Sequence, residues 1–207
     1  MTDPASLDAM TSKKGWPKVD YDKTIWIPCP PAFSEQLTSE EWARGFATLW
    51  WDASGRKHGK RQVRALAQTL LEEQRGIYAT LPCHAALFHL PDVTVPPLAV
   101  CLAVWQSIGD RDTQLRELVH ADEPLAVEAP LVEPVSTGPL GTGLRSQYYQ
   151  REPGGSELMG MLNYAWRVED LETDLRVFTG CPDLGRLEGA TADIDELTRA
   201  ISIEPLS

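Results

Sequence analysis

The sequence lacks any hydrophobic run long enough to cross a bilayer. Its longest apolar stretch, LAVCLAVW at residues 98–105, is far shorter than the about 20 residues that a membrane-spanning helix needs. The opening segment MTDPASLDAMTSKKGWPK has no apolar centre, so we expect no secretory signal there. These two absences predict a cytoplasmic protein without membrane contact.

Catalytic and cofactor-binding motifs are missing as well. There is no G-x-S-x-G nucleophile motif, and no Lys-Ser/Thr pair follows the glycines at 138–143 as it would in a phosphate-binding loop. The four cysteines form no CxxC pair, and we interpret them as small buried hydrophobes. His84 and His89 are expected on opposite faces of one strand, so they would not share a metal. We therefore expect no catalytic residue, metal or cofactor.

Positive charge is scarce overall but locally concentrated. The net charge of −11 repels phosphate backbones, so nucleic acid is not an expected partner. Positive charge at a helix start opposes the helix dipole, and such a placement predicts a surface for an acidic partner. The alternative is a solvated helix start that nearby carboxylates balance. Five cations and one histidine share nine positions at the start of a predicted helix: Arg56, Lys57, His58, Lys60, Arg61 and Arg64.

Two helices are predicted in the first half of the sequence. Thr38 and Glu41 have the spacing of a capping box, and an apolar stripe at helical spacing follows them. A second stripe predicts a helix over residues 58–75, with Gly76 as its natural stop. A short third helix is expected after Asp110, which is a suitable N-cap.

Strand patterns account for most of the remaining sequence. Prolines within residues 24–33 remove backbone donors and predict an edge strand. A flexible loop is expected at residues 136–143. Further strands are predicted at 83–90, 97–106, 125–135, 143–151, 158–168 and 173–179, with a helix at 183–199 and a terminal strand at 201–203.

This order predicts an α+β fold, with helices packed on an antiparallel sheet of about six strands. Residues 1–22 are polar and mixed, and we interpret them as a mobile tail. Residues 23–207 are long enough for one core and are predicted to form a single domain.

Three phrases in the sequence resemble a group of uncharacterised actinobacterial proteins. They are PPAFSEQLTSEEWARGFATLWW, SIGDRDTQLRELVHADEP and the segment from ELMGMLNYAWRVEDLETDL to ELTRAI. The pattern is also similar to the PsbP-like fold, which includes LpqN-type lipoproteins. That resemblance implies a binding or assembly factor rather than an enzyme, and it transfers no site residue. The residues before Cys29 form no lipidation motif, so no lipoprotein role is expected.

A second binding surface is predicted on the sheet. Tyr149, Met159 and Met161, together with Tyr164 and Trp166, could line one face as an adaptable, Met-rich surface. The alternative is that helices cover these side chains and that they belong to the core.

These observations favour a non-catalytic interaction protein, such as a secretion accessory, an immunity-type inhibitor or a component of a larger complex. We expect a protein partner, and the sequence leaves self-association open. The alternatives are a module that binds a small molecule or lipid, and an enzyme built from dispersed residues.

Overall fold

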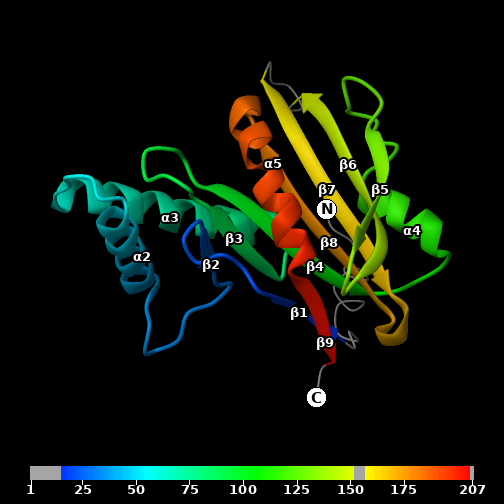
Figure 1. Cartoon of the computed structure of the whole chain (residues 1–207), viewed down its shortest axis with the longest axis horizontal. Helices are drawn as coiled ribbons and strands as arrows, with labels where there is room; N and C mark the ends of the chain where they lie inside the picture. Colours follow the sequence, from blue (N-terminus) through cyan, green and yellow to red (C-terminus); the bar gives the residue numbers. More distant parts are fainter. Residues whose placement is uncertain (1–14, 152–156, 206–207) are drawn as a thin grey trace. The chain divides into compact units, whose positions relative to one another are not determined.

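Helices and strands follow one another along the computed structural model, which describes residues 15–151 and 157–205 (Figure 1). The helices of these residues are α2 (Ser39–Ala53), α3 (Lys60–Thr80), α4 (Arg111–Leu118) and α5 (Leu184–Arg199), with the 3-10 turn η2 (Glu169–Leu171). The strands are β1 (Gly15–Val19), β2 (Trp26–Cys29), β3 (Ala85–His89), β4 (Leu98–Gln106), β5 (Leu131–Thr137), β6 (Gly141–Arg151), β7 (Leu158–Val168), β8 (Thr173–Cys181) and β9 (Ile201–Pro205).

The strands of the described residues form one large sheet and one small sheet. The large sheet has seven strands in the order β2-β3-β4-β8-β7-β6-β5, and the small one pairs β1 with β9. The pairs β2–β3, β5–β6, β6–β7 and β7–β8 are all antiparallel. The predicted α+β class is therefore confirmed, with seven strands in the large sheet instead of about six.

Contacts divide the chain into two compact units. One comprises residues 22–101, and the other combines the described residues up to Tyr21 with those that follow residue 101. The predicted mobile tail differs from the structure in part, because Gly15–Val19 form β1 and pair with Ile201–Pro205. Residues 1–14 lie outside the described residues. The prediction of a single domain stays a prediction.

Helices α2 and α3 form a hairpin in the unit of residues 22–101 (Figure 1). The predicted capping box is present, with Glu41 N–H donating to Thr38 Oγ1 at 3.2 Å and Thr38 N–H donating to Glu41 Oε2 at 2.9 Å. Helix α3 begins near the predicted position but continues through Gly76 to Thr80. The predicted stop is wrong because buried Ile77 extends the apolar stripe, which offsets the about 1 kcal/mol that a glycine costs within a helix.

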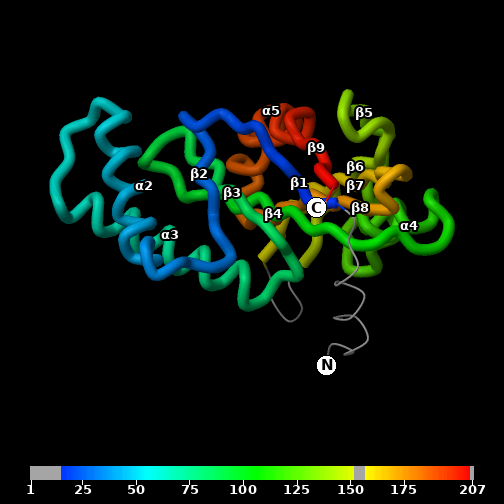
Figure 2. Tube along the Cα trace, turned by 90° about the horizontal axis from the view of Figure 1, so that it is seen from below, coloured from blue at the N-terminus to red at the C-terminus, as the bar shows by residue number. Residues whose placement is uncertain are grey.

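Two helices cover opposite faces of the β6–β7–β8 sheet in the other unit (Figure 2). Gly160 of β7 approaches α5 so closely that an added Cβ would lie 2.8 Å from Leu187. Ala165 lies an odd number of positions from Gly160 in the same strand, so it faces the other side of the sheet, where it packs with Leu115 of α4. Since successive residues of a strand face opposite ways, both faces of the central strand are buried.

The predicted strand over residues 125–135 begins later in the structure, at Leu131. Leu125 and Val127 are half-exposed, and this segment is held to β6 only by an isolated bridge between Ala126 and Gln150 and by the bond from Val127 N–H to the Tyr149 carbonyl oxygen at 2.7 Å. The loop predicted at 136–143 is also shorter than expected, since β5 ends at Thr137 and β6 begins at Gly141. Gly141 has a φ of 72°, a conformation that glycine adopts without strain, and this allows the tight connection.

Candidate protein-binding groove

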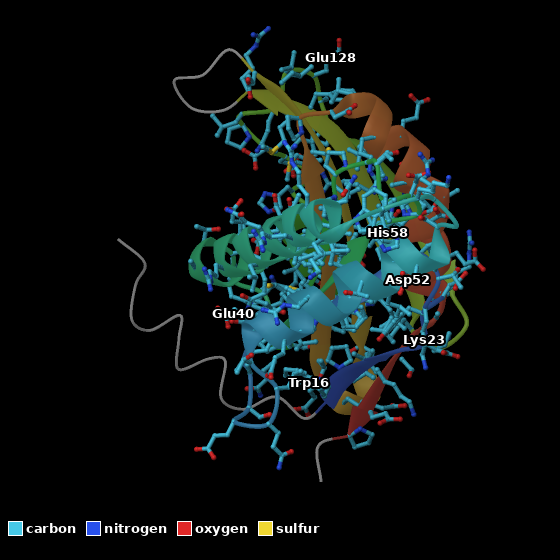
Figure 3. All side chains as sticks on the ribbon, turned by 90° about the vertical axis from the view of Figure 1, so that its left-hand side faces the viewer. Trp16, Lys23, Glu40, Asp52, His58 and Glu128 are labelled. Carbon is cyan, nitrogen blue, oxygen red and sulfur yellow. The ribbon has the colours of Figure 1, made fainter. Side chains whose placement is uncertain are left out.

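The helix pair that forms the groove is antiparallel, as polar side-chain contacts at its two ends show. Glu40, at the start of α2, lies 3.3 Å from Arg75 near the end of α3. Asp52, near the end of α2, lies 3.2 Å from His58, which precedes α3. Figure 3 shows Asp52 and His58 together at one end of α2 and Glu40 at the other.

An open groove of about 720 Å³ runs between α2 and α3. The helical side chains that line it fall into three sets. Within each set the residues recur every four positions, so each set forms a stripe along one helix face. The groove has an apolar stripe on α3 formed by Val63, Ala67 and Leu71. Polar stripes flank it on both sides, formed by Lys60, Arg64 and Gln68 on α3 and by Glu40, Arg44 and Thr48 on α2.

The groove is strongly positive at the end where α3 begins. No acidic residue occurs between Asp52 and Glu72 in the sequence. Lys60 and Arg64 form no ion pair with any residue that the structure describes. Lys60 also begins α3, where the helix dipole disfavours a cation by a few tenths of a kcal/mol. Two cations that form no ion pair with the described residues make this end of the groove suited to an anionic group from outside.

The structure separates the predicted basic cluster into three parts. Lys60 and Arg64 line the groove with His58. Arg56 does not line it, because its guanidinium pairs with Asp92 at 2.7 Å and borders a different pocket of about 550 Å³.

The remaining two cations, Lys57 and Arg61, are exposed and outside the groove. They form no ion pair among residues 15–151 and 157–205. The alternative of a helix start balanced by carboxylates therefore applies to Arg56 alone of the five cations.

Sequence reasoning missed the contribution of α2 to this groove. Arg44 faces the groove from the side of α2 opposite the buried Trp42 and Trp50. The signal was present in the four-residue spacing of Glu40, Arg44 and Thr48. It could not be assigned to a site until the pairing of α2 with α3 was known.

The second predicted surface is not formed, because its members lie on opposite sheet faces. Tyr149 pairs with Gly160 and lines a groove of about 530 Å³ beside α5. Met159 and Met161 pair with Gln150 and Tyr148 on the other face. An added Cβ at Gly180 would lie 2.8 Å from the Met161 sulfur and 3.1 Å from the Met159 sulfur, so both methionines pack over that glycine.

Tyr164 and Trp166 belong to the core, as the alternative interpretation of this set predicted. Both are almost completely buried, and their rings stack at 5.9 Å with an interplanar angle of 2°. The Tyr164 hydroxyl donates to Asp195 at 2.6 Å, and burial raises the pKa of this phenol. A buried, hydrogen-bonded tyrosine of this kind fixes the position of α5 on the sheet.

Comparison with known proteins shows a likeness in fold. No protein-family model and no curated protein matches the sequence. The fold is similar to that of LpqN. This protein of Mycobacterium tuberculosis is described as involved in cell envelope biogenesis, and its crystal structure matches with a TM-score of 0.52. The match covers 95% of this chain and 88% of LpqN at 9% sequence identity, so it shows the fold alone.

This comparison bears on two predictions from the sequence. It supports the LpqN-type part of the resemblance, while the PsbP-like part stays a prediction. It contradicts the predicted cytoplasmic location, because the matched protein acts in envelope biogenesis. No helix of the described residues combines the length and apolar character that crossing a membrane requires.

The groove combines cationic and aliphatic side chains. Its lining consists of guanidinium, ammonium, amide, hydroxyl and aliphatic side chains, with one carboxylate and one imidazole. Among residues 15–151 and 157–205, no group of three or more His, Cys, Asp or Glu side chains is placed to hold a metal ion. This chemistry is suited to an occupant with one anionic edge and one apolar face.

Proposed function

We propose that this chain is a non-catalytic accessory protein of an envelope-associated assembly, and that its α2–α3 groove binds an acidic, amphipathic helix of a partner protein. The observation that carries the proposal is the pair Lys60 and Arg64, two cations without an ion pair among the described residues, beside an apolar stripe in a chain of net charge −11. The envelope setting is supported by the role of LpqN in envelope biogenesis.

The dimensions of the groove favour a helix. From Lys60 to Leu71 the α3 side of the groove spans about 16 Å, or three helical turns. Cations four residues apart on α3 match carboxylates four residues apart on a facing helix. Helix-in-groove docking uses apolar anchors at the same spacing, which the stripe of Val63, Ala67 and Leu71 can receive.

The polarity of the groove also predicts the orientation of the partner. The end near Lys60 and Arg64 is positive, whereas the opposite end carries Glu40 paired with Arg75. The carboxylates of the partner helix should therefore lie at the end where α3 begins.

A small apolar ligand or a lipid fits this groove less well. Ligand pockets enclose most of the surface of their ligand, and this groove is open along its length. An acyl chain lying on the apolar stripe would keep one side in water. The lipid alternative is therefore an outcome of the experiment and not a second proposal.

The test compares two charge reversals on the same structural unit. The variant Lys60→Glu/Arg64→Glu changes the groove, and the control Lys57→Glu/Arg61→Glu makes the same change in net charge outside it. Each lost surface attraction is worth about 0.2–1 kcal/mol, and reversal adds a repulsion of similar size. We expect the groove variant to weaken binding roughly tenfold or more and the control less than about threefold.

Binding is measured by fluorescence anisotropy with a synthetic amphipathic helix that has leucines on one face and glutamates every four residues beside them. A peptide with lysines in place of the glutamates is the matched negative control. If both variants lost the same amount of affinity, the overall positive potential of residues 56–64 would explain binding without the groove, and the proposal would be overturned. Stronger binding of phosphatidylglycerol vesicles than of the acidic peptide, abolished by the groove variant, would instead support a lipid ligand and also refute it.

A further inference from the structure

The seven-stranded sheet extends past the helix that covers one of its faces. Helix α5 packs on β7 and β8, and the same face of the sheet continues over β6 and β5 beside it (Figure 1). Neighbouring strands lie about 4.8 Å apart, so β6 and β5 form a ledge about 10 Å wide. A helix with its side chains is about 10 Å across, and the ledge is therefore wide enough for one more helix next to α5.

Exposed apolar side chains gather on this ledge. Leu131 lies opposite Gln147 and shares its face of the sheet. Val127 lies beside Tyr149, since its N–H donates to the Tyr149 carbonyl oxygen at 2.7 Å. A contiguous apolar patch marks an interaction site more often than isolated exposed residues do. Of the nine large hydrophobic side chains that are exposed among the described residues, four lie on β6 or on the segment alongside it: Leu125, Val127, Leu131 and Tyr149.

The groove of about 530 Å³ between this ledge and α5, called the α5 groove below, has an acidic wall. Gln147 and Tyr149 line it from β6, and the side chains that line it from α5 include Glu188 and Asp195. No Lys, Arg or His of the described residues lines it. Glu188 is exposed and forms no ion pair with any residue in the described part of the chain, so its charge is available to a partner.

Asp195 is held in position on the same wall. The Tyr164 hydroxyl donates to its Oδ1 atom at 2.6 Å, and the Arg145 Nε atom lies 3.7 Å from that same oxygen. Its Oδ2 atom accepts no hydrogen bond from residues 15–151 or 157–205. Arg145 is also bound to Glu133, to which its Nη1 atom donates at 2.6 Å. The wall thus offers a carboxylate of fixed position with one oxygen that can accept from outside.

We propose that the α5 groove binds a basic, amphipathic helix of a partner protein. Glu188 and Asp195 lie seven residues apart on α5, which places them about 10 Å apart along one helix face. Cations seven residues apart on a partner helix span the same two turns. Apolar side chains between those cations would contact Tyr149 and Leu131, as in other helix-in-groove complexes.

This binding site goes beyond the α2–α3 groove and does not depend on it. The two grooves lie in different compact units and share no lining residue. Their charges are opposite, so they select helices of opposite sign. A chain with both grooves would hold two different partners in one assembly, and this joint role alone rests on the proposed function.

The experiment measures binding to the full-length protein by fluorescence anisotropy. The probe is a synthetic helical peptide that has leucines on one face and arginines seven residues apart beside them. Glu188→Lys reverses a charge in the α5 groove, and Glu196→Lys makes the same change on the same helix at an exposed residue outside it. We expect Glu188→Lys to weaken binding about five- to tenfold and Glu196→Lys less than about twofold.

A second variant tests the apolar part of the site. Tyr149→Ala removes the aromatic contact and should weaken binding about fivefold or more. Lys60→Glu/Arg64→Glu should not weaken binding of this probe. Any binding of the lysine peptide from the α2–α3 experiment should likewise respond to Glu188→Lys and not to Lys60→Glu/Arg64→Glu, so the two proposals hold or fail separately.

Three results would refute the proposal. The wild-type protein might leave the probe unbound, or Glu188→Lys and Glu196→Lys might cause equal losses, in which case the negative charge of the whole chain explains binding. In the third result, sedimentation velocity without peptide shows self-association of the wild type that Glu188→Lys abolishes, and the occupant is then a second copy of this chain. Circular dichroism checks that each variant is folded, and the exposed position of Glu188 makes its variant the decisive one.

Discussion

Removing the guanidinium of Arg167 should destabilise the protein more than any surface substitution. Its Nε and Nη2 atoms donate to the two carboxylate oxygens of Asp174 at 2.7 and 2.9 Å. Arg167 is 7% exposed and Asp174 is 2% exposed, so neither charge has water as a substitute partner. Arg167 also donates to the carbonyl oxygens of Ile108 and Gly109, which fixes the segment after β4.

The expected magnitude follows from what Arg167→Met leaves behind. Breaking a buried ion pair from one side typically costs about 3–5 kcal/mol, and here the buried Asp174 carboxylate would lose its cation and keep a hydrogen bond from the Ser107 hydroxyl at 2.9 Å. With a urea slope of about 2 kcal/mol per M, the unfolding midpoint should fall by roughly 2 M. The double variant Arg167→Met/Asp174→Leu removes both charges and should recover a large part of this loss.

Urea unfolding followed by circular dichroism and tryptophan fluorescence measures these effects. The matched control is Glu133→Gln, which removes the half-exposed partner of Arg145 in an ion pair of 2.6 Å. That change should cost less than about 1 kcal/mol. If Arg167→Met costs no more than Glu133→Gln, or if the double variant is no more stable than the single one, the reasoning from burial is refuted.

Three further predictions concern the fold and its pH dependence. Gly143→Ala should cost about 1–3 kcal/mol in urea unfolding, because the new Cβ would overlap the Ala165 carbonyl oxygen. Thr38→Ala should cost about 1 kcal/mol in the same assay by removing the capping box of α2. Burial alone would raise the pKa of Glu123, but hydrogen bonds, chiefly from His120, outweigh it and lower the pKa. The wild type should therefore lose stability as the pH falls below the ordinary pKa of a glutamate and through the lowered pKa of Glu123, and Glu123→Gln should flatten that decline in unfolding curves recorded at acidic pH.

Features determined by neighbouring residues could be predicted from the sequence. The capping box of Thr38 and Glu41 and the N-cap at Asp110 depend on contacts three residues apart, and both are present. The terminal strand after α5 was also predicted, although its partner β1 was not. That pairing joins segments at opposite ends of the sequence, and no local pattern encodes it.

The candidate groove could be predicted only in part for the same reason. A cluster of cations near residue 60 is visible in the sequence, but Arg44 joins it only because α3 folds back along α2. Once the β6–β7 register is known, the alternation of side chains along each strand places Tyr149 and Met159 on opposite faces of the sheet.

The pairing of β1 with β9 also has a mechanical consequence. Gly15 lies opposite Pro205, and Val19 lies opposite Ile201. Tension applied at residues 15 and 205 would therefore act first on the Gly15–Pro205 pair. The β1–β9 hydrogen bonds would break one pair at a time, instead of all at once as in shear. If the protein were pulled at these two residues, β1 and β9 would separate at low force, before the seven-stranded sheet carried any load.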